Sequence, residues 1–179
     1  MSFLWKTRQP KKQNSLSAIG PSGALVVQVV ECSNLPPGDW SGLSDPFVQV
    51  HLGQTTFKTP FICKTLSPVY DPKDATFTFP IGDEPVGNLT FVAWDKDWYG
   101  QDHLGEAVLQ VKDWFGSGDQ KPRPLAWSAA EREGPFSLLL KHKSESKAVP
   151  PAKIQLKLGF KKAEGQDEDF ETLHKRLCG

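Results

Sequence analysis

One stretch organises the chain: Trp94-Asp95-Lys96-Asp97-Trp98-Tyr99-Gly100-Gln101-Asp102-His103-Leu104-Gly105-Glu106. Asp95, Asp97 and Asp102 fall within eight positions, and two adjacent aromatic residues and a glycine lie among them. Carboxylates this close repel one another unless a cation or hydrogen-bond donors lie between them, because each negative charge disfavours the ionisation of its neighbours. The simplest cation is a hard one that prefers oxygen ligands. The stretch is therefore predicted to be a loop that binds calcium.

The residues around this loop, and much of the chain, show the period of two that β-strands have. The period is clearest where Ile154, Leu156, Leu158 and Phe160 alternate with polar residues. Seven more strands are expected at residues 25–30, 48–52, 55–59, 75–79, 89–94, 107–111 and 136–140, with a helical turn at 112–115 and a variable surface loop at 116–134. Turn-forming residues separate the strands. Eight short strands with no repeated helical segment predict an all-β fold, an eight-stranded antiparallel β-sandwich.

Length and composition predict one domain with tails. The chain has 179 residues, 21 basic and 21 acidic, so no net charge favours nucleic acid as a partner. Residues 1–22 are predicted to be a basic disordered leader, residues 23–162 the domain, and residues 163–179 an acidic tail that is either solvated or a short helix. Three cysteines without metal-type spacing, and no long apolar run, predict a reducing, cytoplasmic location.

The acidic loop by itself also matches part of the EF-hand pattern. Asp95, Asp97, Gly100 and Glu106 stand at positions one, three, six and twelve of that pattern. Position five is Tyr99, where an Asp or Asn belongs, and an EF-hand needs helices on both sides. The β-type flanks disfavour this interpretation. A second alternative is that the aspartates only cap local turns, as they commonly do.

Another acidic loop, which comes earlier in the chain, decides between these interpretations: Asp39-Trp40-Ser41-Gly42-Leu43-Ser44-Asp45-Pro46-Phe47-Val48. It is called the first acidic loop below, and residues 95–106 are called the second. It resembles the first calcium-binding loop of C2 domains, and residues 95–106 resemble their third. Residues 65–70, Thr-Leu-Ser-Pro-Val-Tyr, are similar to the family's Thr-Leu-Asn-Pro-Val-Trp connection, and residues 104–106 to its Ile-Gly-Glu. The resemblance covers residues 23–162 and implies that both acidic loops meet at one end of the sandwich.

By position, the resemblance implies five aspartate ligands for two calcium ions, in a family that binds two or three: Asp39, Asp45, Asp95, Asp97 and Asp102. Backbone carbonyls near Gly38 and at Lys96 are expected to complete the coordination. The chain departs from the family in one interval, because Asp97 and Asp102 are five residues apart where six is more usual. The first calcium site is therefore favoured over the second.

The resemblance also implies a membrane partner. Bound calcium would cancel the repulsion between the loops and an anionic phospholipid such as phosphatidylserine. Trp40, Trp98 and Tyr99 lie at the expected loop tips and are predicted to insert into the membrane, since these side chains favour its interface; the alternative is that they fold back over the loops. Lys58 matches one position of the family's phosphoinositide-binding strand, Pro60 replaces the next, and Lys64 is a partial substitute.

Two strand orders occur in the family, and this chain resembles type II, as in phosphoinositide phospholipase C, because no strand is expected before Leu25 and one follows at Ile154. Residues 93–97, 112–115 and 154–160 look most like C2 domains of fungal phosphatidylserine decarboxylases, so a covalently linked lipid enzyme is one expected partner. Four scattered histidines suggest no catalytic set, and His103 is expected to be a solvated loop residue. The prediction is a non-enzymatic, peripheral membrane-targeting module; the alternative is a calcium-independent C2 domain that docks protein partners.

Overall fold

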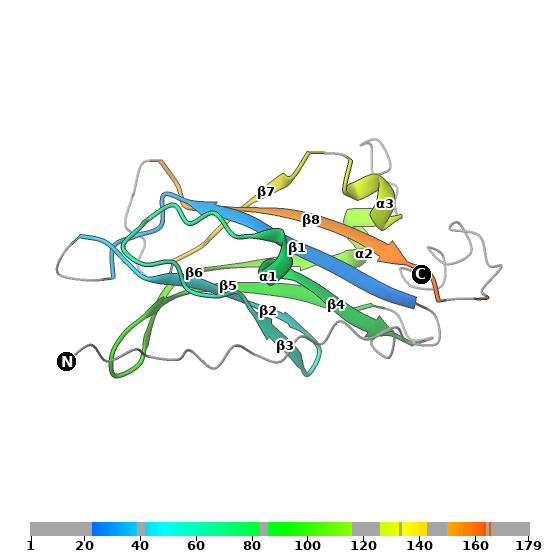
Figure 1. The fold of residues 1–179 in the computed structure, drawn as a ribbon, viewed down its shortest axis with the longest axis horizontal. Helices are drawn as coiled ribbons and strands as arrows, with labels where there is room; N and C mark the ends of the chain where they lie inside the picture. The colour runs from blue at the N-terminus through cyan, green and yellow to red at the C-terminus, as the bar shows by residue number, and fades with distance from the viewer. Residues whose placement is uncertain are drawn as a thin grey trace.

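The computed structural model describes residues 23–38, 42–82, 86–115, 126–132, 134–142, 150–163 and 165. In them, two four-stranded antiparallel sheets pack face to face (Figure 1). The strands are β1 (Gly23–Ser33), β2 (Pro46–Leu52), β3 (Thr55–Lys58), β4 (Thr76–Ile81), β5 (Asn88–Lys96), β6 (Gln101–Gln110), β7 (Phe136–Leu139) and β8 (Lys153–Lys161). Three short helices accompany them: α1 (Pro72–Ala75), α2 (Val111–Phe115) and α3 (Trp127–Ala130). The predicted all-β sandwich is confirmed.

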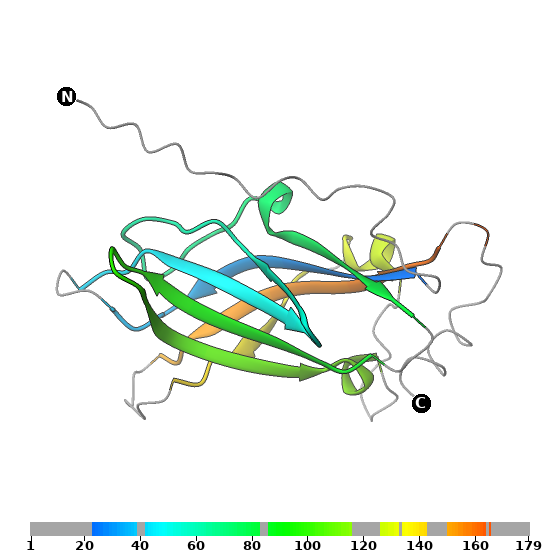
Figure 2. The same cartoon turned by 90° about the horizontal axis from the view of Figure 1, so that it is seen from below.

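The strand order places the last strand beside the first. The β1 sheet has the order β4-β1-β8-β7, and the β2 sheet has the order β3-β2-β5-β6. Strand β8 therefore lies between β1 and β7, as the predicted type II order requires. Figure 2 shows the molecule from the side of the β2 sheet, with β2, β5 and β6 in front of β1 and β8.

Apolar side chains from both sheets fill the space between them. Phe79, Phe91 and Phe160 are among the largest buried side chains, and burying each contributes roughly 2–3 kcal/mol. Phe57 of β3 stacks on Phe77 of β4, with ring centroids 5.4 Å apart, and so closes one side of the sandwich where the two sheets have edge strands. The core thus fixes how the sheets face each other.

Two helices were not expected from the sequence. Helix α1 begins where Asp71 caps the chain, its side chain accepting a 2.9 Å hydrogen bond from the Lys73 amide, with Pro72 at the first helical position. Helix α3 lies inside the stretch predicted to be a variable loop. Trp127 of α3 is buried against Val26 on the outer face of the β1 sheet. That prediction was wrong for α3, because the side chains of Trp127 and Ala130 cover a part of the sheet that solvent would otherwise reach.

The strands around the acidic stretch are longer than expected. Strand β5 continues to Lys96 and β6 begins at Gln101, so only residues 97–100 connect them. The two strands pair through most of the stretch, Asp95 opposite Asp102. A tight β-hairpin therefore presents the acidic residues. Among the described residues, no helix has the length and apolar character needed to cross a bilayer.

Candidate metal-binding site

The two acidic loops lie at the same end of the sandwich. In Figures 1 and 2 the coloured parts of the connection from β1 to β2 (residues 34–38 and 42–45) and the β5–β6 hairpin both lie at the left. Strands β2 and β5 are hydrogen-bonded neighbours, and their register pairs Pro46 with Asp95. Residue 45, which ends the first acidic loop, is thereby brought beside the start of the second. The convergence follows from sheet pairing between segments fifty residues apart.

Asp95 is the buried carboxylate of this group, with 1% of its surface exposed. Its Oδ1 accepts a 2.6 Å hydrogen bond from the Asp45 amide. Its Oδ2 is buried and has no hydrogen-bond partner among the described residues. Gly38 lies directly against that oxygen, since a Cβ built on Gly38 would overlap it. A buried carboxylate oxygen without a partner is costly, and a cation is one way of offsetting that cost.

Asp102 lies opposite Asp95 in the hairpin, although it is exposed. Directly opposed residues of an antiparallel pair point to the same face, and like charges in that position destabilise the pair. The amide of Asp97 donates a 3.1 Å hydrogen bond to the carbonyl of Gly100, which closes the turn between the strands. The short Asp97-to-Asp102 interval is thus accommodated by a tight turn, with Asp102 kept on the Asp95 side of the hairpin.

Asp45 is held by backbone groups from two other segments. Its Oδ1 accepts a 2.7 Å hydrogen bond from the Lys64 amide, and its carbonyl accepts one of 3.1 Å from the Lys96 amide. Asp45 and Asp95 therefore each use one carboxylate oxygen to hold the scaffold. Their second oxygens are the ones left for a ligand.

Ser44 organises the first acidic loop, and the sequence reasoning did not identify this role. Its hydroxyl is buried, accepts a 2.8 Å hydrogen bond from the Gly38 amide and donates a 3.4 Å bond to the Pro36 carbonyl. The Ser-Asp-Pro sequence was a signal that could have indicated it, because serine commonly bonds nearby backbone groups in turns. Asp39 and Trp40 lie outside the described residues, so their predicted roles stay predictions.

The hairpin tip carries two exposed aromatic side chains. Trp98 is 77% exposed and Tyr99 is 96% exposed, and their rings pack edge to face at 6.5 Å. At these exposures neither ring folds back over the loops, which was the alternative considered for them. Lys58 and Lys64, the two predicted headgroup contacts, are both exposed, on β3 and on the connection that follows it.

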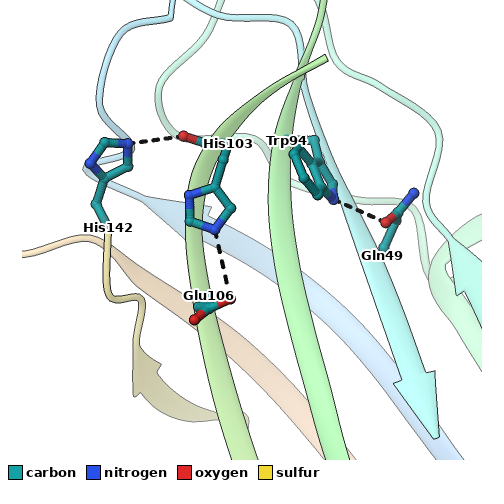
Figure 3. A network of polar contacts seen from close by, with 5 residues as sticks. All are labelled: Gln49, Trp94, His103, Glu106 and His142. Atoms are coloured by element: carbon teal, nitrogen blue, oxygen red, sulfur yellow. Dashed lines mark hydrogen bonds and ion pairs between the residues drawn. The ribbon is translucent and has the colours of Figure 1, made fainter. Parts of the chain in front are cut away.

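His103 lies on the other face of the hairpin, in the group of polar contacts shown in Figure 3. Its side chain is 12% exposed, packs edge-on against Trp94 at 5.5 Å, and has its Nε2 3.9 Å from a Glu106 carboxylate oxygen. His142 hydrogen-bonds the His103 carbonyl at 2.9 Å. The expectation of a solvated His103 was therefore wrong, because strand β6 begins before it and turns it toward Trp94.

The donor set suits calcium chemically, but it is not a complete cage in the residues described. Carboxylate and carbonyl oxygens are the ligands that calcium prefers. Among the described residues, no three or more His, Cys, Asp or Glu side chains form a group that could hold a metal ion. The partnerless Oδ2 of Asp95 and the lack of a side chain at Gly38 nevertheless fit a cation bound beside the first acidic loop.

Known proteins similar to this chain carry C2 domains. Human Synaptotagmin-10 is 35% identical over 91 residues, 48% of this chain and 17% of its own length. The mouse Multiple C2 and transmembrane domain-containing protein 2 is 42% identical over 100 residues, 55% of this chain and 11% of its own length. The matched part is thus less than a fifth of either relative.

A solved structure of a C2 domain from plant Extended Synaptotagmin 1 has the same fold. It superposes with a TM-score of 0.59 at 24% identity, covering 79% of this chain and 96% of that domain. The narrower resemblance to fungal phosphatidylserine decarboxylases is not borne out by these comparisons. The family model for the C2 domain matches residues 23–127, more than half of the chain. With a type II strand order and both acidic loops at one end of its sandwich, the chain belongs to the C2 domain family.

Proposed function

We propose that this C2 domain binds anionic phospholipid membranes in a calcium-dependent manner, through the two acidic loops. Membrane targeting is typical of the family, and calcium binding is common in it. The observation that carries the calcium proposal is the carboxylate of Asp95, which is buried with one oxygen bonded to the Asp45 amide and the other without a partner among the described residues. Such a group is costly to maintain unless something binds it.

The proposed ligands are the carboxylates of the two loops, with backbone carbonyls near Gly38 and at Lys96. The aspartates are Asp39, Asp45, Asp95, Asp97 and Asp102. Bound calcium would supply positive charge and open coordination positions for lipid phosphate oxygens. The protein's own contribution is to hold one carboxylate oxygen of Asp45 and one of Asp95 with backbone amides, so that the other oxygen of each is oriented before binding. Calcium binding is expected to tighten when lipid is present, since phosphates complete the coordination.

The aromatic hairpin tip supports the same orientation toward a membrane. Trp98 and Tyr99 are exposed beside the acidic residues, and Trp and Tyr favour the membrane interface. Lys58 and Lys64 would add positive charge near the surface, each on the order of 1 kcal/mol. The proposed role is reversible targeting to the cytoplasmic face of a membrane, by binding and without catalysis.

Sedimentation with vesicles tests this proposal. Vesicles of phosphatidylcholine with phosphatidylserine, and matched vesicles of phosphatidylcholine alone, are mixed with the protein in calcium or in chelator. The protein is expected to sediment only with phosphatidylserine and calcium together. An Asp95→Asn variant, which keeps an Oδ1 acceptor for the Asp45 amide, is expected to stay in the supernatant. Equal sedimentation in calcium and chelator would contradict the calcium mechanism and favour the calcium-independent alternative.

A further inference from the structure

The connection after β3 runs beside the first acidic loop and is bonded to it by backbone groups. The amide of Ile62 donates to the Pro46 carbonyl at 3.0 Å, and the amide of Thr65 donates to the Ser44 carbonyl at 2.8 Å. Between them, the amide of Lys64 turns instead to the carboxylate of Asp45, at 2.7 Å from Oδ1. This segment contributes no acidic residue, yet its amides bond three successive residues at the end of the first acidic loop, Ser44, Asp45 and Pro46.

The backbone of Lys64 has an uncommon conformation that makes this contact. Its φ is +56°, in the left-handed region, where among described residues only Asn34 and Lys64 are not glycine. Left-handed backbone is unfavourable for a residue with a Cβ, and such strain persists only where surrounding contacts hold it. The Lys64 side chain is exposed, so its charge points to solvent while its amide faces the acidic loop.

The bond at Asp45 is directional. A short, charge-assisted hydrogen bond from an amide restrains the position of one carboxylate oxygen. Asp95 is fixed in the same way by the Asp45 amide. Two hydrogen bonds, from the Lys64 amide to Asp45 and from the Asp45 amide to Asp95, therefore link the connection after β3 to the carboxylate of Asp95 in the second acidic loop.

We propose that Lys64 is a positioning residue for calcium binding, acting through its backbone amide and left-handed conformation and not through its charge. The inference rests on the proposed calcium function. It assigns a role in calcium binding to a segment that has no metal ligand, and this backbone role is separate from the proposed contact of the Lys64 side chain with lipid headgroups.

Substitutions at residue 64 separate the two roles. Lys64→Gly and Lys64→Asn remove the charge but adopt left-handed backbone easily, and Lys64→Arg keeps the charge. Lys64→Val disfavours the conformation because a β-branched residue rarely has positive φ. In calorimetric titration without lipid, we expect the glycine, asparagine and arginine variants to have the calcium affinity of the wild type. The valine variant is expected to bind calcium about tenfold more weakly. The proposal would be overturned if calcium affinity fell in both uncharged variants, Lys64→Gly and Lys64→Asn, but not in Lys64→Arg. It would also be overturned if Lys64→Val bound calcium as tightly as the wild type.

A second measurement does not need calcium. In the metal-free protein, the Lys64 amide proton is expected to exchange slowly with solvent and to resonate downfield in an NMR spectrum. Asp45→Ala should speed its exchange and move the resonance, Asp45→Asn should largely preserve both, and Asp113→Asn on α2 is the remote control. The positioning role would be refuted if the Lys64 amide proton exchanged fast in the wild type and its exchange rate and resonance did not change in Asp45→Ala. If the wild type binds no calcium, both the proposed function and the role of Lys64 in calcium binding are contradicted, and the amide measurement then shows only whether Lys64 holds the Asp45 carboxylate.

Discussion

At the scale of single residues, Asp95 and Asp102 face each other across the β5–β6 hairpin with the same charge. This arrangement costs stability in the absence of a cation, because the carboxylates repel. Asp102→Asn is therefore expected to raise the calcium-free stability by roughly a few tenths of a kcal/mol and to reduce the rise in Tm that calcium produces. Thermal unfolding in chelator and in calcium measures both. Asp113→Asn, far from the hairpin, should change neither, and an undiminished calcium shift in Asp102→Asn would argue against Asp102 as a ligand.

The buried side chains of Cys32 and Tyr70 should make the stability of the protein depend on pH in the alkaline range. Burial, with the nearby charge of Glu31, raises the pKa of Cys32 above its ordinary range. Burial and the Cys32 thiolate raise the pKa of Tyr70, against a smaller lowering by its hydrogen bond with Thr59. A raised folded pKa gives stability that is present below the unfolded pKa and lost as pH rises through the folded value. Stability should therefore fall above about pH 8.5 for the thiol and about pH 10 for the phenol.

Tyr70→Phe tests the phenol's share of this loss. The hydroxyl donates a 3.3 Å hydrogen bond to the Pro46 carbonyl, so its removal is expected to lower stability at pH 7 by about 1 kcal/mol. Above pH 10, however, the variant should lose stability less steeply than the wild type, since it has no phenol to ionise. Urea unfolding at pH 7, 9 and 10.5 gives the two slopes. Parallel curves for wild type and variant would show that Tyr70 does not contribute to the alkaline loss.

At the scale of elements, α3 depends on a glycine in β8. A Cβ on Gly159 would lie 2.7 Å from the Trp127 Cα and 2.9 Å from its amide nitrogen, and neither backbone atom can move without displacing α3. Gly159→Ala is expected to destabilise the domain by about 2 kcal/mol in urea unfolding. Gly87→Ala is the matched control, because a Cβ there meets nothing within 4 Å. An equally stable Gly159→Ala would mean that α3 does not pack on β8 as described.

Substitutions at the hairpin tip are expected to weaken lipid binding without changing metal binding. Trp98 and Tyr99 contribute exposed rings but no carboxylate, so replacing both with alanine should leave calcium affinity in solution unchanged. Binding to phosphatidylserine vesicles in calcium should weaken about tenfold or more, because the interface loses two aromatic anchors. Val108→Ala removes an exposed apolar side chain from the β6 strand away from the tip, and should bind like the wild type. Equal vesicle binding by all three proteins would exclude insertion of the tip.

At the scale of the whole molecule, the proposed function places the membrane at the end of the sandwich that carries the two acidic loops. Cys63 is exposed near this end, one residue before the amide that binds Asp45. Gly87 precedes β5 and so lies at the opposite end of that strand from Asp95. Cys178, the third cysteine of the sequence, is replaced with serine so that it does not take up the label. The emission of an environment-sensitive fluorophore on Cys63 should then shift to the blue when calcium and phosphatidylserine vesicles are added. The same fluorophore on Gly87→Cys with Cys63→Ser should not respond. Equal responses at both ends would contradict this orientation.

The strands could be predicted well because their evidence is local. Ile154 to Phe160 alternate, and the alternation survives in β8 with its apolar residues buried. Helix α3 could not be predicted, because Trp127 forms it by packing on Val26, a residue a hundred positions earlier. His103 was missed for a related reason: β6 begins two residues before it, and strand pairing turns it toward Trp94.

The candidate site divides in the same way. The sequence was sufficient to choose four described candidate ligands, because crowded charges and the two loop motifs can be recognised from residues that are close together in the chain: Asp45, Asp95, Asp97 and Asp102. The sequence could not predict that Asp95 is buried with one oxygen that has no partner among the described residues. Nor could it predict that Ser44 and the Lys64 amide hold the first acidic loop. These facts depend on which segments lie side by side.

The sequence by itself determined an all-β domain with two acidic loops and exposed aromatic residues at the tip of one, because alternation, turn residues and charge spacing act over a few positions. Only the tertiary structure decided which carboxylate is buried, which oxygens are already bonded and which backbone amide aims at Asp45. The physical reason is that burial and hydrogen bonding are set by contacts between distant segments, and sheet pairing of β2 with β5 creates those contacts.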